Sequence, residues 1–279
     1  MKKLTQKKYW ETIYNSNEQI KNENLKKKLK KIFPSVFLKY FSAYYDFLLW
    51  DVVLPKYLKE YKDGESVIEI GSAPGNFLVK FSKRFRKIPF GVEYTALGAK
   101  KNREIFKQNN INPKNIFEMD FLSKMFLENN RGLYDIVISR GFIEHFKKPS
   151  VIVGHHIEIL RPGGLLIVLI PNLTGIYYFW TKMFNPKQLN IHNLEIMKIQ
   201  NFEELFRSNK IHKLQSGYFG TFGFWLFTAP EKSCVLRSFI RMLYLVQRVL
   251  NLIFRLIFRE KGCDSSFFSP NLIYIGRKI

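Results

Sequence analysis

The stretch that decides the fold is "ESVIEIGSAPGNFLVKF", residues 65–81. A short apolar run containing one acid leads into a turn with two glycines, and an amphipathic segment follows the turn. The apolar run 66–70 is typical of a buried strand, and the segment 75–85 predicts a helix behind it. A strand, a tight turn and a helix in this order commonly form a ligand-binding unit.

The same alternation of apolar runs and amphipathic stretches continues to about residue 172. Further strands are predicted at 88–94, 115–121, 134–141 and 163–172, with helices at 96–110 and 149–160. Continuous apolar strands separated by helices are typical of a parallel sheet that is covered on both faces. Ligands bind such sheets at the carboxyl ends of the strands, so the residues at these ends are the candidates for a site.

The composition narrows the class of protein. The chain has 279 residues, of which 46% are hydrophobic, so it can bury a sizeable core. Cys234 and Cys263 provide neither a disulfide framework nor a zinc site, and the N-terminal segment has no apolar stretch of signal-peptide length. We therefore expect a cytoplasmic protein. The net charge of +22 favours a polyanionic partner such as nucleic acid or an anionic membrane, although a lysine-rich genome composition would give the same sum.

Two phosphate-binding interpretations of the glycine turn fail. A P-loop requires Gly-Lys-Ser/Thr, whereas Asn76 and Phe77 follow Gly75. A dinucleotide fingerprint requires G-x-G-x-x-G, and Gly71 and Gly75 do not fall in that register. The remaining interpretation is S-adenosylmethionine, a ligand without phosphate. It needs close backbone approach at small residues and an acid for its ammonium group.

An acid stands at each of three successive strand ends. Glu69 precedes the turn between two isoleucines, so its side chain points away from theirs, and we expect it to face the ammonium group. Glu93 ends the second strand and is expected to bind both ribose hydroxyls. Asp120 ends the third strand beside the adenine amino group, with Phe121 stacking on the ring. A single acid at a strand end is usually a solvated loop residue. Acids at three successive strand ends, in register with the glycine turn, favour a cofactor site.

At these residues the sequence resembles the class I S-adenosylmethionine-dependent methyltransferases. The resemblance covers about residues 62–172 and depends on "EIGSAPG", "VEY", "MDF" and "YDIVISRGFIEHF…LRPGGLLIVLIPN". Ala73 departs from the family, which often has glycine there. The family implies an α/β, Rossmann-like fold with a mostly parallel seven-stranded sheet and helices on both faces. It implies a cofactor site built from Glu69, Gly71, Ser72, Ala73, Gly75, Glu93, Tyr94, Asp120, Phe121 and Ser139.

The resemblance also predicts the elements in the rest of the chain. After the fifth strand the prediction is a helix at 201–209, strands at 211–220 and 271–278, and between those strands a helical insertion at about 229–268. The methyltransferase domain is then residues 63–279, preceded by an N-terminal helical cap at 1–62. The basic and aromatic stretch 25–58 of this cap is expected to cover the cofactor.

The segment "SRGFIEHF", residues 139–146, follows the fourth strand and supplies the candidate catalytic residues. Methyl transfer is an in-line displacement that needs acceptor and methyl group held close together, with a base where the nucleophile is a hydroxyl. His145 is the candidate base because its ordinary pKa of about 6.5 lets it accept a proton near neutrality. Glu144 would orient His145 or bind a metal ion, and no metal site is otherwise predicted.

"IEHF" is similar to the corresponding segment of quinone-biosynthesis-type O-methyltransferases. That similarity implies a small or lipid-like acceptor that is methylated at oxygen. His192, in "NIHNLE", falls in the region that caps the substrate pocket in such proteins and is a further pocket candidate.

Two other functions stay open. "GSAPG" is also similar to the glycine motif of RNA methyltransferases, and the positive charge would suit RNA. The ribose-methylating type needs an Asp after the fourth strand, where Ser139, Arg140 and Gly141 stand. The Pro-Pro and Pro-Cys motifs of base-methylating enzymes are absent, so nucleic acid is the less favoured partner. A catalytically inactive, membrane-associated scaffold is the alternative from another class, and the three intact acids argue against it.

The inserted segment 234–262 predicts a helix with arginines on one face. At about 100° per residue, five of them fall within roughly 40° of each other: Arg237, Arg241, Arg248, Arg255 and Arg259. Most other residues are apolar, but no run reaches the ~18 residues of a membrane span. Such a helix is typical of a segment in the headgroup plane of an anionic bilayer, so we expect the 234–259 helix to place the protein peripherally on the inner face of a membrane. Packing against the domain and dimerisation are the alternatives.

Overall fold

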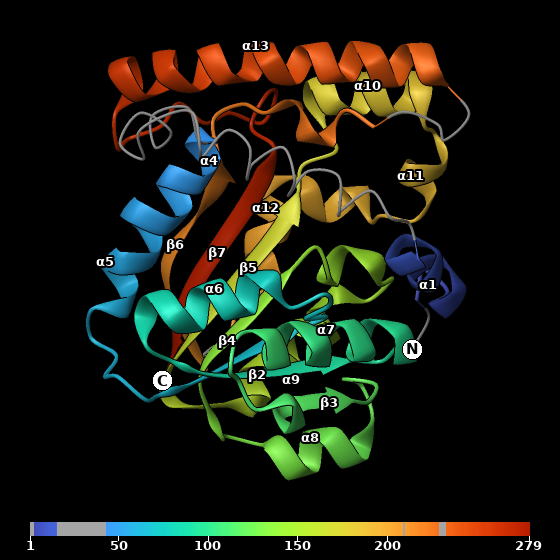
Figure 1. Cartoon of the computed structure of the whole chain (residues 1–279). Helices are drawn as coiled ribbons and strands as arrows, with labels where there is room; N and C mark the ends of the chain where they lie inside the picture. Colours follow the sequence, from blue (N-terminus) through green and yellow to red (C-terminus); the bar gives the residue numbers. More distant parts are fainter. Residues whose placement is uncertain (1–2, 16–42, 209, 229–232) are drawn as a thin grey trace.

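The computed structural model describes residues 3–15, 43–208, 210–228 and 233–279 (Figure 1). Within them, seven strands form one sheet in the order β3-β2-β1-β4-β5-β7-β6. The strands are β1 (Ser66–Ile70), β2 (Ile88–Glu93), β3 (Ile116–Glu118), β4 (Tyr134–Arg140), β5 (Leu160–Pro171), β6 (Ile211–Phe219) and β7 (Asn271–Lys278). Strands β1 to β5 are parallel, and β7 runs antiparallel to both β5 and β6.

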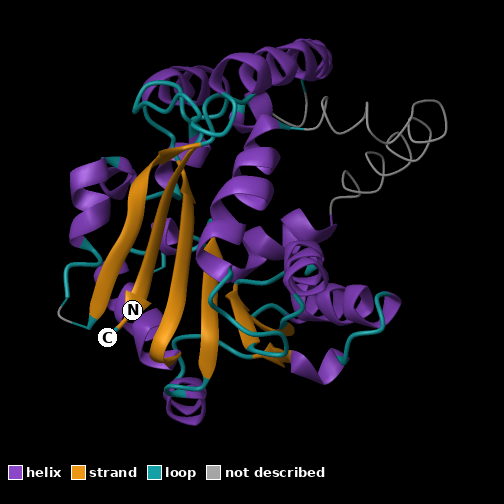
Figure 2. Cartoon of the chain, turned by 90° about the vertical axis from the view of Figure 1, so that its left-hand side faces the viewer, coloured by secondary structure: helices purple, strands orange, loops and turns teal. Residues whose placement is uncertain are grey.

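Helices cover both faces of this sheet (Figure 2). One face packs against α4 (Tyr44–Phe47), the π-helical segment Leu48–Val53, α5 (Leu54–Leu58), α6 (Asn76–Phe85) and α7 (Ala96–Gln108). The other face packs against α8 (Lys124–Asn130), α9 (Pro149–Ile159) and α12 (Ile199–Glu204). The other α-helices of the described residues are α1 (Lys7–Asn15), α10 (Gly175–Phe184), α11 (Lys187–Asn190) and α13 (Cys234–Phe258).

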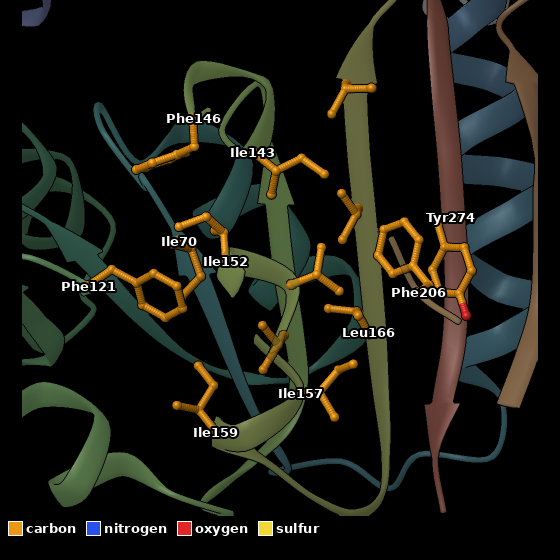
Figure 3. Packing of buried hydrophobic residues seen from close by; sticks show 14 of the residues in the cluster. Ile70, Phe121, Ile143, Phe146, Ile152, Ile157, Ile159, Leu166, Phe206 and Tyr274 are labelled. Atoms are coloured by element: carbon orange, nitrogen blue, oxygen red, sulfur yellow. The ribbon is translucent and has the colours of Figure 1, made fainter. Parts of the chain in front are cut away.

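The alternation of side chains along the strands divides the core in two. Val67 of β1 is buried with the helices of the first face, whereas Ile68 and Ile70 are buried with those of the second. Figure 3 shows the second cluster, in which Phe206 stacks on Tyr274 with ring centres 3.6 Å apart. Burying side chains of this size stabilises the fold by about 1.5–3 kcal/mol each. Both faces of the central strands are thus buried, which explains why they read as continuous apolar runs.

The predicted Rossmann-like fold is confirmed, although several element boundaries differ from the prediction. The third strand was expected to reach residue 121 but ends at Glu118, so Asp120 and Phe121 lie in the following loop. There an Asp120 carboxylate oxygen accepts a hydrogen bond from the backbone N–H of Leu122 at 3.0 Å. The inserted helix ends at Phe258, one residue before the end of the predicted 234–259 helix, and the following Arg259 has the left-handed φ of +48°.

The described parts of the N-terminal region lie in two places. Helix α1 packs against α7, whereas residues 44–58 pack against α6 and α13. The prediction that residues 25–58 cover the cofactor is therefore wrong for 44–58, none of which lines the cavity described below. Residues 16–42 lie outside the described residues. The segment that does cover the cavity is 3–15, which we call the N-terminal lid.

Helix α13 lies across one end of the molecule, with α10 beside it (Figure 1). This is the end at which β5 finishes, because Pro171 leads into α10 and pairs with the first residue of β7. No helix among the described residues combines the length and the apolar character needed to cross a bilayer.

Candidate functional site

A cavity of about 250 Å³ opens at the carboxyl ends of β1, β2 and β4, beneath the N-terminal lid. Each of these strands and the loop after β3 contributes a residue to its wall. The sequence-predicted residues that line it are Gly71, Ala73, Glu93, Tyr94, Asp120, Phe121 and His145. The order of the strands reverses between β1 and β4, and ligands of open α/β sheets bind at such a reversal.

The glycine turn joins the end of β1 to α6. Gly71 and Gly75 have φ values of +70° and +102°, which favour glycine. A Cβ atom on Gly75 would lie 2.2 Å from the side-chain oxygen of Asn102, so no larger residue fits there. Gly75 begins α6 without lining the cavity, and its contribution is to the shape of the turn.

Two predicted cofactor residues are buried behind the cavity wall. The Ser72 hydroxyl oxygen accepts a hydrogen bond from the Asn102 side-chain N–H at 2.5 Å, which ties the turn to α7. Ser139 lies in β4 beside Ile70, and its hydroxyl has no hydrogen-bond partner among the described residues. Neither side chain lines the cavity.

Glu93 is buried at the end of β2 and held by three hydrogen bonds. One carboxylate oxygen accepts from the backbone N–H and the hydroxyl of Thr95, at 2.9 and 2.7 Å. The other accepts from the hydroxyl of Tyr14 in the lid, at 3.4 Å. Burial raises the pKa of Glu93, and the bonds from Thr95 and Tyr14 oppose that rise. The carboxylate is thus oriented before a ligand arrives.

Glu69 does not line the cavity, and its partner is a protein side chain. Two guanidinium nitrogens of Arg140, at the end of β4, lie 2.9 Å from one Glu69 oxygen. The same guanidinium lies 3.6 Å from the ring centre of Phe77 and reaches the cavity wall. Burial raises the pKa of Glu69 and Arg140 lowers it. The ammonium group that the sequence suggested as counter-ion is therefore replaced by an arginine 71 residues along the chain.

The lid closes the cavity through the predicted adenine side. The Lys3 amino group lies 2.7 Å from an Asp120 oxygen and 4.4 Å from the ring centre of Tyr94. The backbone N–H of Leu4 donates to the His145 carbonyl at 2.7 Å. Two of the acids proposed for the cofactor, Glu93 and Asp120, thus contact the lid.

Of the candidate catalytic pair, His145 lines the cavity. His145 is almost fully buried, and its Nδ1 lies 2.8 Å from the carbonyl oxygen of Ile191. Burial, with a smaller contribution from His192, lowers the pKa of His145 to about 3. A base of this pKa takes up a proton only weakly at neutral pH, so the environment gives the general-base role no support. Glu144 is fully buried and does not line the cavity.

His192, the pocket candidate after α11, is brought to this pair. Its ring centre lies 4.6 Å from that of His145, although His192 itself does not line the cavity.

Several cavity residues were missed from the sequence. They are Lys3, Trp10, Tyr14, Met119, Arg140 and Phe142. Trp10 and Tyr14 stand four residues apart in α1 and therefore share one helix face, which was a readable signal. That this face would lie on the glycine turn was not readable, because the contact joins distant parts of the chain.

Solved structures with the same fold include enzymes of different chemistry. A geranyl diphosphate C-methyltransferase from Streptomyces coelicolor A3(2), crystallised with Mg²⁺, geranyl diphosphate and S-adenosyl-L-homocysteine, has a TM-score of 0.53 and 12% identity, over 80% of this chain and 77% of that one. The (4+2)-cyclase SpnF has a TM-score of 0.52 and 11% identity, over 81% of this chain and 80% of that one. A putative sarcosine dimethylglycine methyltransferase from Galdieria sulphuraria has a TM-score of 0.51 and 13% identity, over 83% of this chain and 84% of that one.

Identities this low establish the fold alone. A comparison with curated protein sequences gives no significant match. A family model described as "Methyltransferase domain" matches residues 42–215, which is more than half of the chain. This range contains the glycine turn, the strand-end acids and the "IEHF" segment. The chain therefore belongs to the methyltransferase domain family.

Proposed function

We propose that the protein is an S-adenosylmethionine-dependent methyltransferase that acts on a small or amphiphilic acceptor. The observation that carries this proposal is the convergence of the Gly71–Ala73 turn, Glu93 and Asp120 on one cavity in a chain of this family. S-adenosylmethionine is the cofactor, and when bound it supplies an electrophilic methyl group. Support comes from neighbours of the same fold that were crystallised with S-adenosylmethionine or S-adenosylhomocysteine.

The residues of the cavity fit this cofactor. Gly71 and Ala73 leave the backbone accessible, Glu93 would accept from the ribose hydroxyls, and Asp120 with Phe121 would hold the adenine. For the methionyl end we assign Arg140, whose guanidinium can bind a carboxylate with two hydrogen bonds. Glu69, behind Arg140, then acts by positioning the guanidinium. Because the lid contacts Glu93 and Asp120, we expect cofactor binding to replace the contacts of Tyr14 and Lys3.

The outward side of α13 favours an amphiphilic acceptor. This helix turns polar amides toward the domain and apolar side chains toward solvent: Val235, Met242, Leu245, Val249, Leu256 and Ile257 are exposed. Phe179 and Met183 of α10 are also exposed, and Met183 lines a shallow pocket together with Val235 and Phe239 of α13. Soluble proteins rarely expose so continuous an apolar patch without a partner.

We assign this surface to an anionic membrane. Arg241 and Arg248 are exposed beside it, as expected for a helix whose arginines meet lipid headgroups. Since α10 follows the carboxyl end of β5 and the cavity lies at the carboxyl ends of β1, β2 and β4, a membrane at α10 and α13 would lie at the same edge of the sheet as the cavity. A cytoplasmic protein on the inner face of the membrane fits this arrangement. We propose oxygen as the methylated atom, on the similarity of "IEHF" to O-methyltransferases.

The test is calorimetric titration of S-adenosylhomocysteine. The wild type should bind it with a dissociation constant in the micromolar range. Glu93→Ala should weaken binding by about 10–100-fold, since a charged hydrogen bond contributes about 1.5–3 kcal/mol. Arg140→Ala should weaken it similarly. The control is Glu118→Ala, which removes an acid that pairs with Arg103 outside the cavity and should bind as the wild type does.

Absence of binding to folded wild type would contradict the proposal. With binding established, an acceptor screen separates the remaining alternatives. Methylation of lipids or quinols supports the proposal, and methylation of RNA alone would favour the RNA methyltransferase. Binding without turnover on any acceptor would favour the inactive scaffold.

A further inference from the structure

Three metal-binding side chains meet beside the cavity. Glu144 and His145 lie in the 3-10 turn Ile143–His145 after β4, and His192 follows α11. One ligand atom from each lies within 4.8 Å of the other two. His192 lies 47 residues after His145 in the chain, so the cluster exists only in the folded protein.

Both imidazole rings are oriented by the backbone. Nδ1 of His145 lies 2.8 Å from the carbonyl oxygen of Ile191, and Nδ1 of His192 lies 2.6 Å from that of Gln188. A carbonyl oxygen only accepts, so each Nδ1 carries the proton and each Nε2 keeps a lone pair. Backbone carbonyls fix metal-binding histidines in this way.

The environment of Glu144 is a second, independent indication of a bound cation. Its side chain is 0% exposed, and neither carboxylate oxygen has a hydrogen-bond partner among the described residues. His145 Nε2 lies 3.8 Å from one Glu144 carboxylate oxygen, beyond hydrogen-bond distance. An unpaired polar group at such depth is costly, and a bound cation would compensate it.

Hydrogen bonds from Asn193 connect the two loops that carry the cluster. The N–H of Asn193 donates to the Glu144 carbonyl at 2.7 Å, and the Asn193 side chain donates to the Phe146 carbonyl at 3.3 Å. These bonds join the two loops that carry the three side chains. Ligands at about 2.0–2.2 Å from one ion lie about 3–3.5 Å apart, so binding needs side-chain shifts on the order of 1 Å.

We propose that Glu144, His145 and His192 bind one divalent transition-metal ion. Two imidazoles and one carboxylate suit Zn²⁺, Mn²⁺, Fe²⁺ or Co²⁺ better than Mg²⁺ or Ca²⁺, which prefer oxygen ligands. Three protein ligands leave coordination positions open, and His145 lines the cavity. In the proposed methyltransferase, on which this last step depends, an acceptor hydroxyl at an open position would lose its proton more readily.

The test is metal binding by the full chain after chelator treatment. Zn²⁺ titrated by calorimetry should bind at one ion per chain, and Co²⁺ should give visible absorption bands of a nitrogen-ligated ion. Glu144→Gln and His192→Ala should each weaken binding by at least 100-fold. The control is His212→Ala, which removes an exposed histidine of β6 and should leave binding unchanged. Zn²⁺ should also raise the melting temperature of the wild type and the control only.

Wild-type protein that binds neither ion, or variants that bind as tightly as the wild type, would overturn the metal site. Titrating S-adenosylhomocysteine into the same variants separates this outcome from failure of the methyltransferase proposal. Glu144 does not line the cavity, so Glu144→Gln should bind S-adenosylhomocysteine as the wild type does.

Discussion

At the scale of single residues, the Glu69–Arg140 ion pair makes a prediction about pH. Burial raises the pKa of Glu69 above its ordinary 4.5, and Arg140 holds it down. Arg140→Ala removes the counter-ion, so the pKa of Glu69 rises further and the folded state binds a proton that the unfolded state has lost. Stability falls with rising pH wherever the folded state holds more protons. We therefore expect the variant to lose about 1–3 kcal/mol, more at pH 8 than at pH 5.

Urea unfolding of the wild type and the variant at both pH values checks this. The double variant Glu69→Gln, Arg140→Ala carries no carboxyl group at this position, so its deficit should be the same at pH 5 and pH 8. An equal deficit of the single variant at both pH values would show that Glu69 does not depend on Arg140.

Residue positions were predictable where the signal is local. Gly71, Glu93 and Asp120 line one cavity because each follows or ends an apolar run, and parallel strands bring such ends together; that they bind the cofactor stays a prediction. The partner of Glu69 was missed because Arg140 belongs to another strand, and the register between strands is not written in either segment alone.

At the scale of elements, α13 is attached to the domain by amides. Gln247 accepts from the Phe224 N–H at 3.0 Å and donates to the Phe222 carbonyl at 3.3 Å. Asn251 accepts from the Tyr44 N–H at 3.2 Å. Gln247→Leu makes the helix more apolar, yet it should destabilise its docking by about 1–3 kcal/mol, because the partly buried N–H of Phe224 and carbonyl of Phe222 lose their partner.

Hydrogen exchange of the α13 amides measures this docking. Exchange should accelerate in Gln247→Leu and stay unchanged in Val249→Leu, a control on the exposed side of the same helix. Unchanged exchange in both variants would mean that packing of residues such as Ile240, and not the amides, holds the helix.

The helix and its arginine spacing were predictable, since both follow from a period of 3.6 residues. Which side would face the domain was not. The sequence left open whether the apolar residues would meet a membrane, the domain or a second copy, and in the structure two of the three buried residues of α13 are Gln247 and Asn251. The polar side faces the domain because Gln247 and Asn251 bind backbone groups of other segments. The sequence of the helix alone does not reveal these partners. Arg255, one of the five arginines predicted to share a face, lies over the ring of Phe47.

At the scale of the whole molecule, the net charge of +22 and the outward apolar side of α13 together predict membrane binding. Wild-type protein should co-sediment with vesicles of anionic lipid and only weakly with neutral vesicles. Neutralising Arg241 and Arg248 to Gln should weaken binding by about 10–30-fold, because each basic residue near an anionic surface contributes about 1 kcal/mol. Binding should also fall as salt rises, since exposed charges are screened.

A matched pair of variants separates position from total charge. Lys107→Gln with Lys114→Gln removes the same charge from exposed sites on α7 and the turn after it, and should bind nearly as the wild type does. Leu245→Ser with Leu256→Ser should abolish the binding that survives high salt, because both side chains are at least 60% exposed and would enter the bilayer. If the wild type is instead a dimer that this apolar variant dissociates, then α13 buries its outward side against a second copy, and the membrane assignment falls.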